Sequence, residues 1–354
     1  MPISRAIQEG SPGSLTGTAV VATHFGGAEA LDVMKWPVRP PGPQEVRVRV
    51  EATAISFADL LMCQGLHPER RKPPFVPGWD VVGEVESVGA HVTDISSGDR
   101  VAGLSIVGGW AEHALIPRLR VVQVPAELDA TSAVCLVMDY IVAYQMLTRS
   151  APVRRGNTVL IQGAGGGVGT AAMQLGKTLD VRVLGTDREK KRAHIESEGG
   201  VLIDFEHEDV VERCRELTGG RGVDAAYDGI GATAWQSLKA VRHGGRLIWF
   251  GMVTMLSGSG RRDFRRGVTT ALRVGPVLAH NLLPMGKRTS FYSIQQLAKK
   301  RPEWYQEDLT ALLEMVAAGE ISPRIAKVWA LDEVPTAIAG MAKGAMPGKQ
   351  VIGV

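Results

Sequence analysis

The sequence has few of the features that mark extracellular, membrane or nucleic-acid-binding proteins. Its 354 residues include only 3 cysteines, which are far apart and form no C-x-x-C pair, so they predict neither a disulfide framework nor a zinc site. Aromatic residues make up 5% of the chain, too few to predict stacking surfaces for single-stranded nucleic acid. The net charge is only +3, and we find neither an 18-residue apolar run nor a signal-peptide core. We therefore expect a cytoplasmic protein with no nucleic-acid partner and no integral membrane association.

The length of 354 residues and the order of patterns along the chain favour two domains. Between residues 17 and 124, short alternating segments such as Val46–Glu51 are separated by Gly and Pro, as is typical of a compact β-barrel. A helical pattern over residues 133–148 follows, and alternating strand and helix patterns then continue to about residue 250. This second part predicts a parallel α/β sheet.

The clearest functional signal lies in residues 157–187, where a β-rich segment leads into a glycine turn, a helix and a second strand. The glycines are spaced Gly163-x-x-Gly166-x-x-Gly169, which departs from the strict G-x-G-x-x-G pattern. Glycine permits a tight turn and removes Cβ atoms where a pyrophosphate approaches the backbone, and the following helix directs its N-terminus at the phosphates. The predicted cofactor-binding residues of this loop are Gly163, Gly166, Gly167, Val168 and Gly169.

Four further residues are predicted to contact a nicotinamide dinucleotide. Asp187 ends the second strand, where a carboxylate binds the ribose hydroxyls of NADH. Arg188 and Arg192 follow it and offer charges that suit the 2′-phosphate of NADPH. The choice between NADPH and NADH stays open at this point. Gly251, which ends a later predicted strand, is also assigned to the cofactor site.

Five segments carry a resemblance to a known family. They are Ile55–Leu61, Pro74–Val85, Ser97–Val101, Gly108–Glu112 and Gly163–Gly169. In this order they resemble the N-F-x-D-x-x, P-x-x-x-G-x-E-x-x-G-x-V, G-D-R-V, G-G-Y-A-E and A-x-G-G-V-G segments of the medium-chain dehydrogenase/reductase superfamily. The resemblance extends over nearly the whole chain from residue 17.

The resemblance implies an α/β chain in which a Rossmann doubly wound parallel sheet is combined with a GroES-like β-barrel catalytic domain. Residues 1–138 would form the first part of the catalytic domain, residues 139–290 the Rossmann domain, and residues 291–354 the return to the catalytic domain. A homodimer is also expected.

Zinc-dependent members of this superfamily bind the metal with a Cys, a His in a G-H-E turn and a later Cys. Here Ser56 stands at the position of the first Cys and Trp79 at that of the His, so thiolate and imidazole ligands are missing. The chain therefore resembles the zinc-free quinone oxidoreductase branch, and no metal site is expected. The segment Met138–Tyr144 also resembles a helix of the VAT-1-like group within it.

The catalytic candidates follow from the same resemblance. Ser56 replaces an Asn that lines the nicotinamide pocket of relatives, and nearby Asp59 is read either as a site residue or as a helix cap. His67 occupies a position where relatives carry a proton-donating Tyr, and an imidazole can do the same near neutral pH. Tyr140 is the alternative donor, unless its hydroxyl is satisfied in the core.

The resemblance to the zinc-free branch implies an enzyme that uses NADPH or NADH to transfer hydride to a small electrophile, either a quinone or an activated C=C bond. The alternative is a cofactor-binding sensor, or a lipid-associated adaptor of the VAT-1-like type with little turnover. Residues 252–290 are rich in arginine and leucine, and are read either as a lid over the active site or as an amphipathic surface for anionic lipid.

Overall fold

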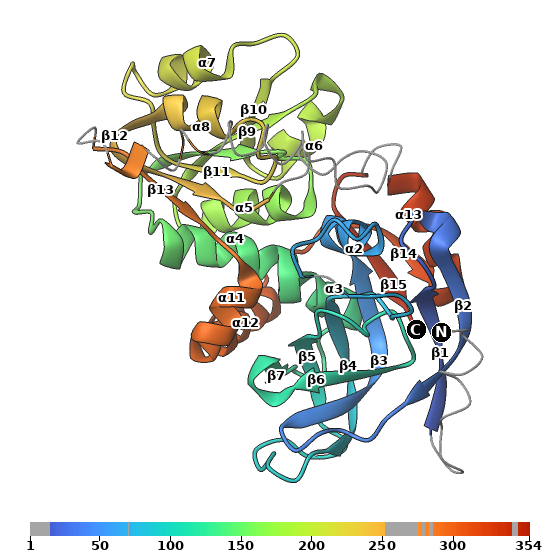
Figure 1. Cartoon of the computed structure of the whole chain (residues 1–354). Coiled ribbons are helices and arrows are strands. Elements are labelled where there is room, and N and C mark those ends of the chain that lie inside the picture. The colour runs from blue at the N-terminus through green and yellow to red at the C-terminus, as the bar shows by residue number, and fades with distance from the viewer. Residues whose placement is uncertain are drawn as a thin grey trace. The chain divides into compact units, whose positions relative to one another are not determined.

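The computed structural model describes residues 15–69, 71–251, 275, 277, 280–282, 286–341 and 346–354, and the chain divides into two compact units (Figure 1). The first, here called the barrel unit, comprises residues 1–138, 298–318 and 323–354. The second, the Rossmann unit, comprises residues 139–297 and 319–322. The return to the barrel unit comes later than the predicted residue 291, because residues 288–291 form an edge strand of the Rossmann sheet.

The barrel unit is built on a seven-stranded sheet and a separate two-stranded hairpin. The sheet order is β14-β15-β3-β4-β5-β7, with β6 paired to β3, while β1 pairs with β2. The strands are β1 (Leu15–Ala22), β2 (Leu31–Val38), β3 (Glu45–Ile55), β4 (Asp80–Val88), β5 (Arg100–Leu104), β6 (His113–Pro117), β7 (Val121–Gln123), β14 (Ile325–Ala330) and β15 (Lys349–Gly353). The C-terminal strand β15 lies antiparallel to β3, so the two ends of the chain build one sheet.

The alternation predicted for residues 46–51 is present in β3, whose valines point into the barrel core. Val46, Val48 and Val50 are buried there against valines of β4 and β5. The helical elements of this unit are η1 (Ala28–Ala30), α2 (Phe57–Cys63), η2 (Arg118–Arg120), α3 (Ala130–Cys135), α12 (Pro302–Ala317), η7 (Leu331–Glu333) and α13 (Val334–Met341).

The Rossmann unit contains a six-stranded parallel sheet in the order β10-β9-β8-β11-β12-β13. Counted from β8, this is the strand order 3-2-1-4-5-6 of a dinucleotide-binding sheet. The strands are β8 (Thr158–Gln162), β9 (Arg182–Asp187), β10 (Gly200–Asp204), β11 (Val223–Asp228), β12 (Val241–Trp249) and β13 (Arg288–Phe291). The predicted fold class, a Rossmann sheet together with a GroES-like barrel, is confirmed.

Helices pack against this sheet through apolar side chains, with a core that includes Leu160, Leu184 and Leu247. The helical elements of the unit are α4 (Ile141–Gln145), η4 (Met146–Ser150), α5 (Gly167–Thr178), η5 (Glu189–Lys191), α6 (Arg192–Ser197), α7 (Val210–Leu217), α8 (Ala234–Ala240), η6 (His280–Leu282) and α11 (Ile294–Lys300), and η3 (Leu136–Tyr140) contains the boundary between the two units.

One continuous helical segment, Ala130–Ser150, is long and apolar enough to cross a membrane, contrary to our reading that no such run exists. Its most apolar 18-residue window is 72% buried inside the protein, however. A buried core helix passes the same test of length and composition, so the segment alone does not indicate a membrane span.

Candidate functional site

The glycine loop connects the central strand β8 to the N-terminus of α5. Gly163 has a φ of +77°, which favours glycine, and Gly166 is the N-cap of α5 without a side chain to bond the first helical N–H groups. A Cβ added to Gly166 would meet only the Gly163 carbonyl oxygen within 4 Å, at 3.5 Å. The backbone is therefore open at an uncapped helix N-terminus, which fits the approach of a pyrophosphate.

The other glycines of the loop are required by close packing. A Cβ on Gly167 would collide with the Asp139 carboxylate, and one on Gly169 would collide with the backbone of Ala164. Val168 lies between them and is half-buried. All five predicted loop residues thus lie together at the start of α5. Asp139 was not predicted as a site residue, although its place directly before Tyr140 in a recognised segment was a signal.

Asp187 ends β9 beside the loop and uses both carboxylate oxygens within the protein. Its Oδ2 accepts a hydrogen bond from the Gly165 N–H at 3.0 Å and lies 3.2 Å from the Lys191 Nζ, while its Oδ1 accepts from the Arg188 N–H at 2.9 Å. The side chains of Asp187 and Lys191 are 11% and 15% exposed. The sequence offers Lys190 and Lys191, like Arg192, either as partners for a phosphate or as the charged start of a helix, and the i,i+4 spacing of Asp187 and Lys191 predicts this ion pair.

The two predicted phosphate-binding arginines point to other partners. The Arg188 guanidinium pairs with Glu206 at 2.7 Å, and Arg192 pairs with Glu189 at 2.6 Å and Glu196 at 3.1 Å. These are exposed ion pairs that hold each guanidinium along the surface of the unit. The structure therefore gives Lys191, rather than either arginine, the position beside the glycine loop.

Gly251 follows β12 at the same edge of the sheet and packs on the backbone of Gly229, so a side chain at residue 251 would collide there. Its carbonyl accepts a hydrogen bond from the Trp249 indole N–H. Gly251 therefore shapes the ends of β11 and β12. Most of the arginine-rich segment that follows, including residues 252–274, lies outside the described residues, so the lid prediction stays a prediction.

In the barrel unit, Ser56 begins α2 and closes its N-terminus with Asp59. The Ser56 hydroxyl lies 2.6 Å from Asp59 Oδ2, the Asp59 N–H donates to the Ser56 Oγ, and the Ser56 N–H donates back to the Asp59 carboxylate at 2.8 Å. This reciprocal arrangement is a capping box. Of the two readings of Asp59, the structure supports the helix cap, and it gives Ser56 the same role.

Asp59 belongs to a buried group of charges. It accepts a further hydrogen bond from the Gly78 N–H at 3.0 Å, and burial together with the nearby Asp80 raises the pKa of its carboxyl to about 7. Asp80 in turn lies 3.2 Å from the Lys349 Nζ, with both side chains almost completely buried. One lysine thus stands against two buried carboxyls, an arrangement that the sequence did not reveal.

His67 lies in the loop after α2 and is partly buried against the edge of Trp79, with ring centroids 5.2 Å apart. Its Nδ1 lies 3.2 Å from the Glu69 backbone N–H, which donates to it, so the ring proton is placed on Nε2. Burial lowers the pKa of the imidazole below its ordinary value. Both observations favour a neutral ring that can donate a hydrogen bond from Nε2, and the role of His67 as a proton donor stays a prediction.

Tyr140 is 3% exposed, and its hydroxyl donates to Gln174 Oε1 at 2.7 Å. Gln174 also donates to Glu198 and to the Ser322 carbonyl, so the hydroxyl belongs to a buried network. This environment argues against Tyr140 as a proton donor, and we assign it a structural role.

The residues at the zinc-ligand positions do not fit the metal. The Ser56 hydroxyl is engaged with Asp59, and the Trp79 indole is 1% exposed and offers neither thiolate nor imidazole. Within the described part of the chain, no group of three or more His, Cys, Asp or Glu side chains is arranged to hold a metal ion.

We compared the chain with family models and with known proteins. Residues 42–126 match the model of the alcohol dehydrogenase GroES-like domain, and residues 167–274 match that of the zinc-binding dehydrogenases. The chain is 32% identical to the synaptic vesicle membrane protein VAT-1 homolog of Rattus norvegicus, over 94% of this chain and 83% of that one. It is 30% identical to a quinone oxidoreductase of Pseudomonas aeruginosa, over 93% of this chain and 97% of that one.

The chain belongs to the medium-chain dehydrogenase/reductase family. It falls among the quinone oxidoreductase-like members, and the family predicted from the sequence is confirmed. Solved structures agree: the Escherichia coli quinone oxidoreductase complexed with NADPH matches with a TM-score of 0.83 at 25% identity, covering 95% of this chain and 100% of that one. A human VAT-1 homolog-like protein matches with a TM-score of 0.81 at 27% identity, covering 96% and 99%.

Proposed function

We propose that this protein is a zinc-independent, NADPH-dependent oxidoreductase that transfers hydride to a quinone or to an activated C=C bond. The observation that carries the proposal is the uncapped N-terminus of α5, where Gly166 leaves the backbone open for a pyrophosphate. The Escherichia coli relative bound to NADPH supports it. A small electrophilic molecule is the expected substrate.

A bound reduced nicotinamide supplies the hydride in such a reaction. The contribution of the chain is to position the acceptor and to stabilise the charge that develops on its oxygen. His67 suits this second role, because its neutral ring carries the proton on Nε2 and can donate a hydrogen bond to a carbonyl oxygen. Water then provides the proton that completes the product.

The preference for NADPH rests on the contacts of Asp187. Its carboxylate already accepts two backbone N–H groups and is neutralised by Lys191, so it is a poor free acceptor for ribose hydroxyls. The Lys191 Nζ, 3.5 Å from the Gly165 carbonyl oxygen of the loop, would exchange its partner Asp187 for a 2′-phosphate, whose greater negative charge favours that exchange. We therefore expect Lys191→Gln to lower kcat/KM for NADPH by roughly tenfold and to change it little for NADH, since a charged hydrogen bond contributes about this much. Arg192→Gln, at an exposed ion pair, is the control and should change neither value.

Zinc independence rests on the chemistry of the side chains at Ser56 and Trp79, which cannot replace the missing ligands. No step of the proposed reaction passes through a metal. The expected homodimer and cytoplasmic location remain predictions.

The second candidate is a cofactor-binding protein with little turnover, favoured by the 32% identity to a synaptic vesicle membrane protein homolog. The two candidates separate in one experiment, in which oxidation of NADPH and of NADH is followed at 340 nm with quinones, enones and enoyl thioesters as acceptors. Turnover with a quinone or an enone supports the enzyme. Tight NADPH binding without turnover on any acceptor would support the second candidate instead.

A further inference from the structure

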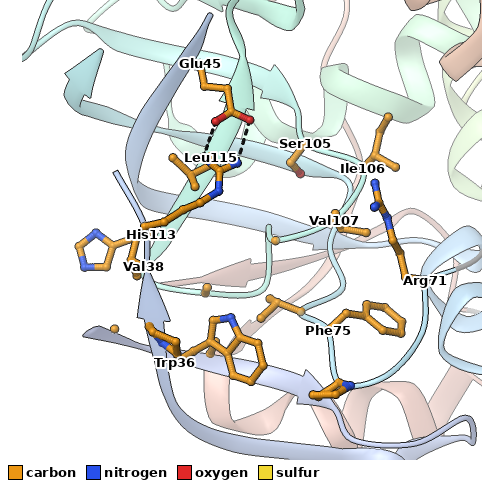
Figure 2. Close-up of a pocket in the computed structure, with 18 of the residues that line it drawn as sticks. Trp36, Val38, Glu45, Arg71, Phe75, Ser105, Ile106, Val107, His113 and Leu115 are labelled. Carbon is orange, nitrogen blue, oxygen red and sulfur yellow. Dashed lines mark hydrogen bonds and ion pairs between the residues drawn. The ribbon is translucent and has the colours of Figure 1, made fainter. Parts of the chain in front are cut away.

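A cavity of about 1240 Å³ lies within the barrel unit, and all its lining residues belong to that unit (Figure 2). It is walled by the β1–β2 hairpin, the segments around residues 69–76 and 105–108, β6 and η2. None of the residues assigned above to the cofactor or to catalysis lines it. Its volume exceeds that of most small-molecule sites, so it has room for a ligand of moderate size.

Most of the wall is apolar. Figure 2 shows Trp36 reaching in from β2 and Phe75 lying on the same side of the cavity, with Ile106, Val107 and Leu115 on other parts of the wall. Two of these side chains are aromatic and offer flat surfaces to an aliphatic or aromatic body. A ligand of this cavity therefore needs an apolar part.

The charges of the cavity do not cancel. Arg39 and Glu45 form a pair with two hydrogen bonds, of 2.6 and 2.9 Å, and neutralise each other. Of the remaining charged side chains on the wall, three are cationic, Arg71, Lys72 and Arg120, and one, Glu69, is anionic. Among the described residues none forms a hydrogen bond or ion pair with these three cations. The cavity therefore presents a net charge of +2 to a ligand.

Of the three cations, Arg71 and Lys72 are exposed and Arg120 is half-buried. Arg120 is half-buried in η2, and this burial lowers the pKa of its guanidinium. Arg71 extends across the cavity toward Ile106 in Figure 2. A partly desolvated arginine gains most from an anion with two oxygens in one plane, because its N–H groups form a planar fork.

We propose that this cavity binds an amphipathic carboxylate, with its head at Arg71 and Arg120 and its apolar body against Trp36 and Phe75. A neutral apolar ligand would leave the cations without a partner, and a small inorganic anion would leave the apolar wall unused. The site lies apart from the residues of the proposed oxidoreductase function and does not depend on it.

The first test is a calorimetric titration of the whole protein with four probes, namely octanoate, octanol, acetate and octyl phosphate. Octanoate should bind at least about tenfold more tightly than octanol or acetate, since each lacks one of the two recognised parts. Equal binding of octanol would show a merely apolar cavity, and equal binding of acetate would show a simple anion site. Tighter binding of octyl phosphate than of octanoate would overturn the carboxylate assignment.

The second test locates the site with variants. The double variant Arg71→Gln/Arg120→Gln should weaken octanoate binding by roughly tenfold or more, as should Trp36→Ala. Arg49→Gln, which removes an exposed arginine paired with Glu84 outside the cavity, is the matched control and should bind octanoate like the parent. A urea-denaturation midpoint like that of the parent shows that the variants are folded. Octanoate binding that survives the double variant and Trp36→Ala would overturn the proposal.

Discussion

Two junctions of this protein share one local plan, in which a strand leads through a turn into a helix, yet they treat the helix N-terminus in opposite ways. In the barrel unit, β3 leads into α2, and Ser56 with Asp59 caps the helix with its own side chains. In the Rossmann unit, β8 leads into α5, and the N-cap Gly166 has no side chain to offer. The first, here called the closed junction, is satisfied by the protein's own side chains, whereas the second, the open junction, leaves its first helical N–H groups without a side-chain cap and open to water or a ligand.

The same strand–turn–helix layout therefore gives a capped or an uncapped helix N-terminus, depending on the residue at the N-cap position. The two junctions also differ in the charges around them. Asp59, Asp80 and Lys349 are buried together behind the capped turn, whereas Arg188 and Arg192, which follow the strand next to the glycine loop, lie in exposed pairs. The stability of the closed junction therefore depends on its buried charges, and the proposed cofactor binding at the open junction depends on its backbone geometry.

The largest expected effect concerns the buried charges behind the closed junction. Lys349→Met removes the cation 3.2 Å from Asp80 and leaves two buried carboxyls without it. We expect this variant to lower the free energy of unfolding by about 3–5 kcal/mol, measured by urea denaturation. The control is Arg49→Met at the exposed Arg49–Glu84 pair, with an expected loss below about 1 kcal/mol. Equal losses in the two variants would show that burial of the charges is unimportant.

The open junction is tested by Gly166→Val. The added side chain fills the space above the loop, so NADPH affinity should fall by on the order of 100-fold, or about 2.7 kcal/mol. Gly340→Val is the control, because a Cβ there also meets nothing within 4 Å but lies on α13 in the barrel unit. Unchanged NADPH affinity in Gly166→Val would remove the loop from the cofactor site.

The pH dependence of the free energy of unfolding tests whether Asp59 is buried at the closed junction. Because the folded pKa of Asp59, about 7, lies above its ordinary value of 3.8, the unfolded chain loses this proton first as the pH rises. Asp59 therefore contributes stability that is fully present below about pH 4 and is lost by about pH 7, with a slope of at most about 1.4 kcal/mol per pH unit. Urea denaturation of the parent and of Asp59→Asn between pH 4 and 8 measures it. The parent should lose stability relative to the variant over this range, and parallel curves would refute the assignment.

The smallest effect is expected from Ser56→Ala. Loss of the cap should lower the free energy of unfolding by about 1 kcal/mol and leave NADPH affinity unchanged. A large loss of NADPH affinity with unaltered stability would instead make Ser56 a cofactor-binding residue, and the contrast between the two junctions would fail.

The sequence predicted best those features that are formed by residues close together along the chain. The glycine loop, the strand before it and the position of Asp187 at the end of the next strand were predicted because a few adjacent residues determine that geometry, but the internal partners of Asp187 were not. The sequence left two readings of Tyr140 open, and the role of Asp80 and the cavity in the barrel unit were not predictable, since they depend on partners far along the chain, such as Gln174 for Tyr140 and Lys349 for Asp80. The predicted roles of Arg188 and Arg192 were drawn from spacing alone. In the structure both guanidinium groups pair with acidic residues instead.

The most direct test of the proposed function combines metal analysis with turnover. The protein is dialysed against a chelator, its zinc content is measured by mass spectrometry, and NADPH oxidation with a quinone acceptor is then followed on the same sample. The structure predicts undiminished turnover with far less than one zinc per chain, because Ser56 and Trp79 replace the metal ligands. Turnover that is lost with the metal and restored by one zinc per chain would contradict the account.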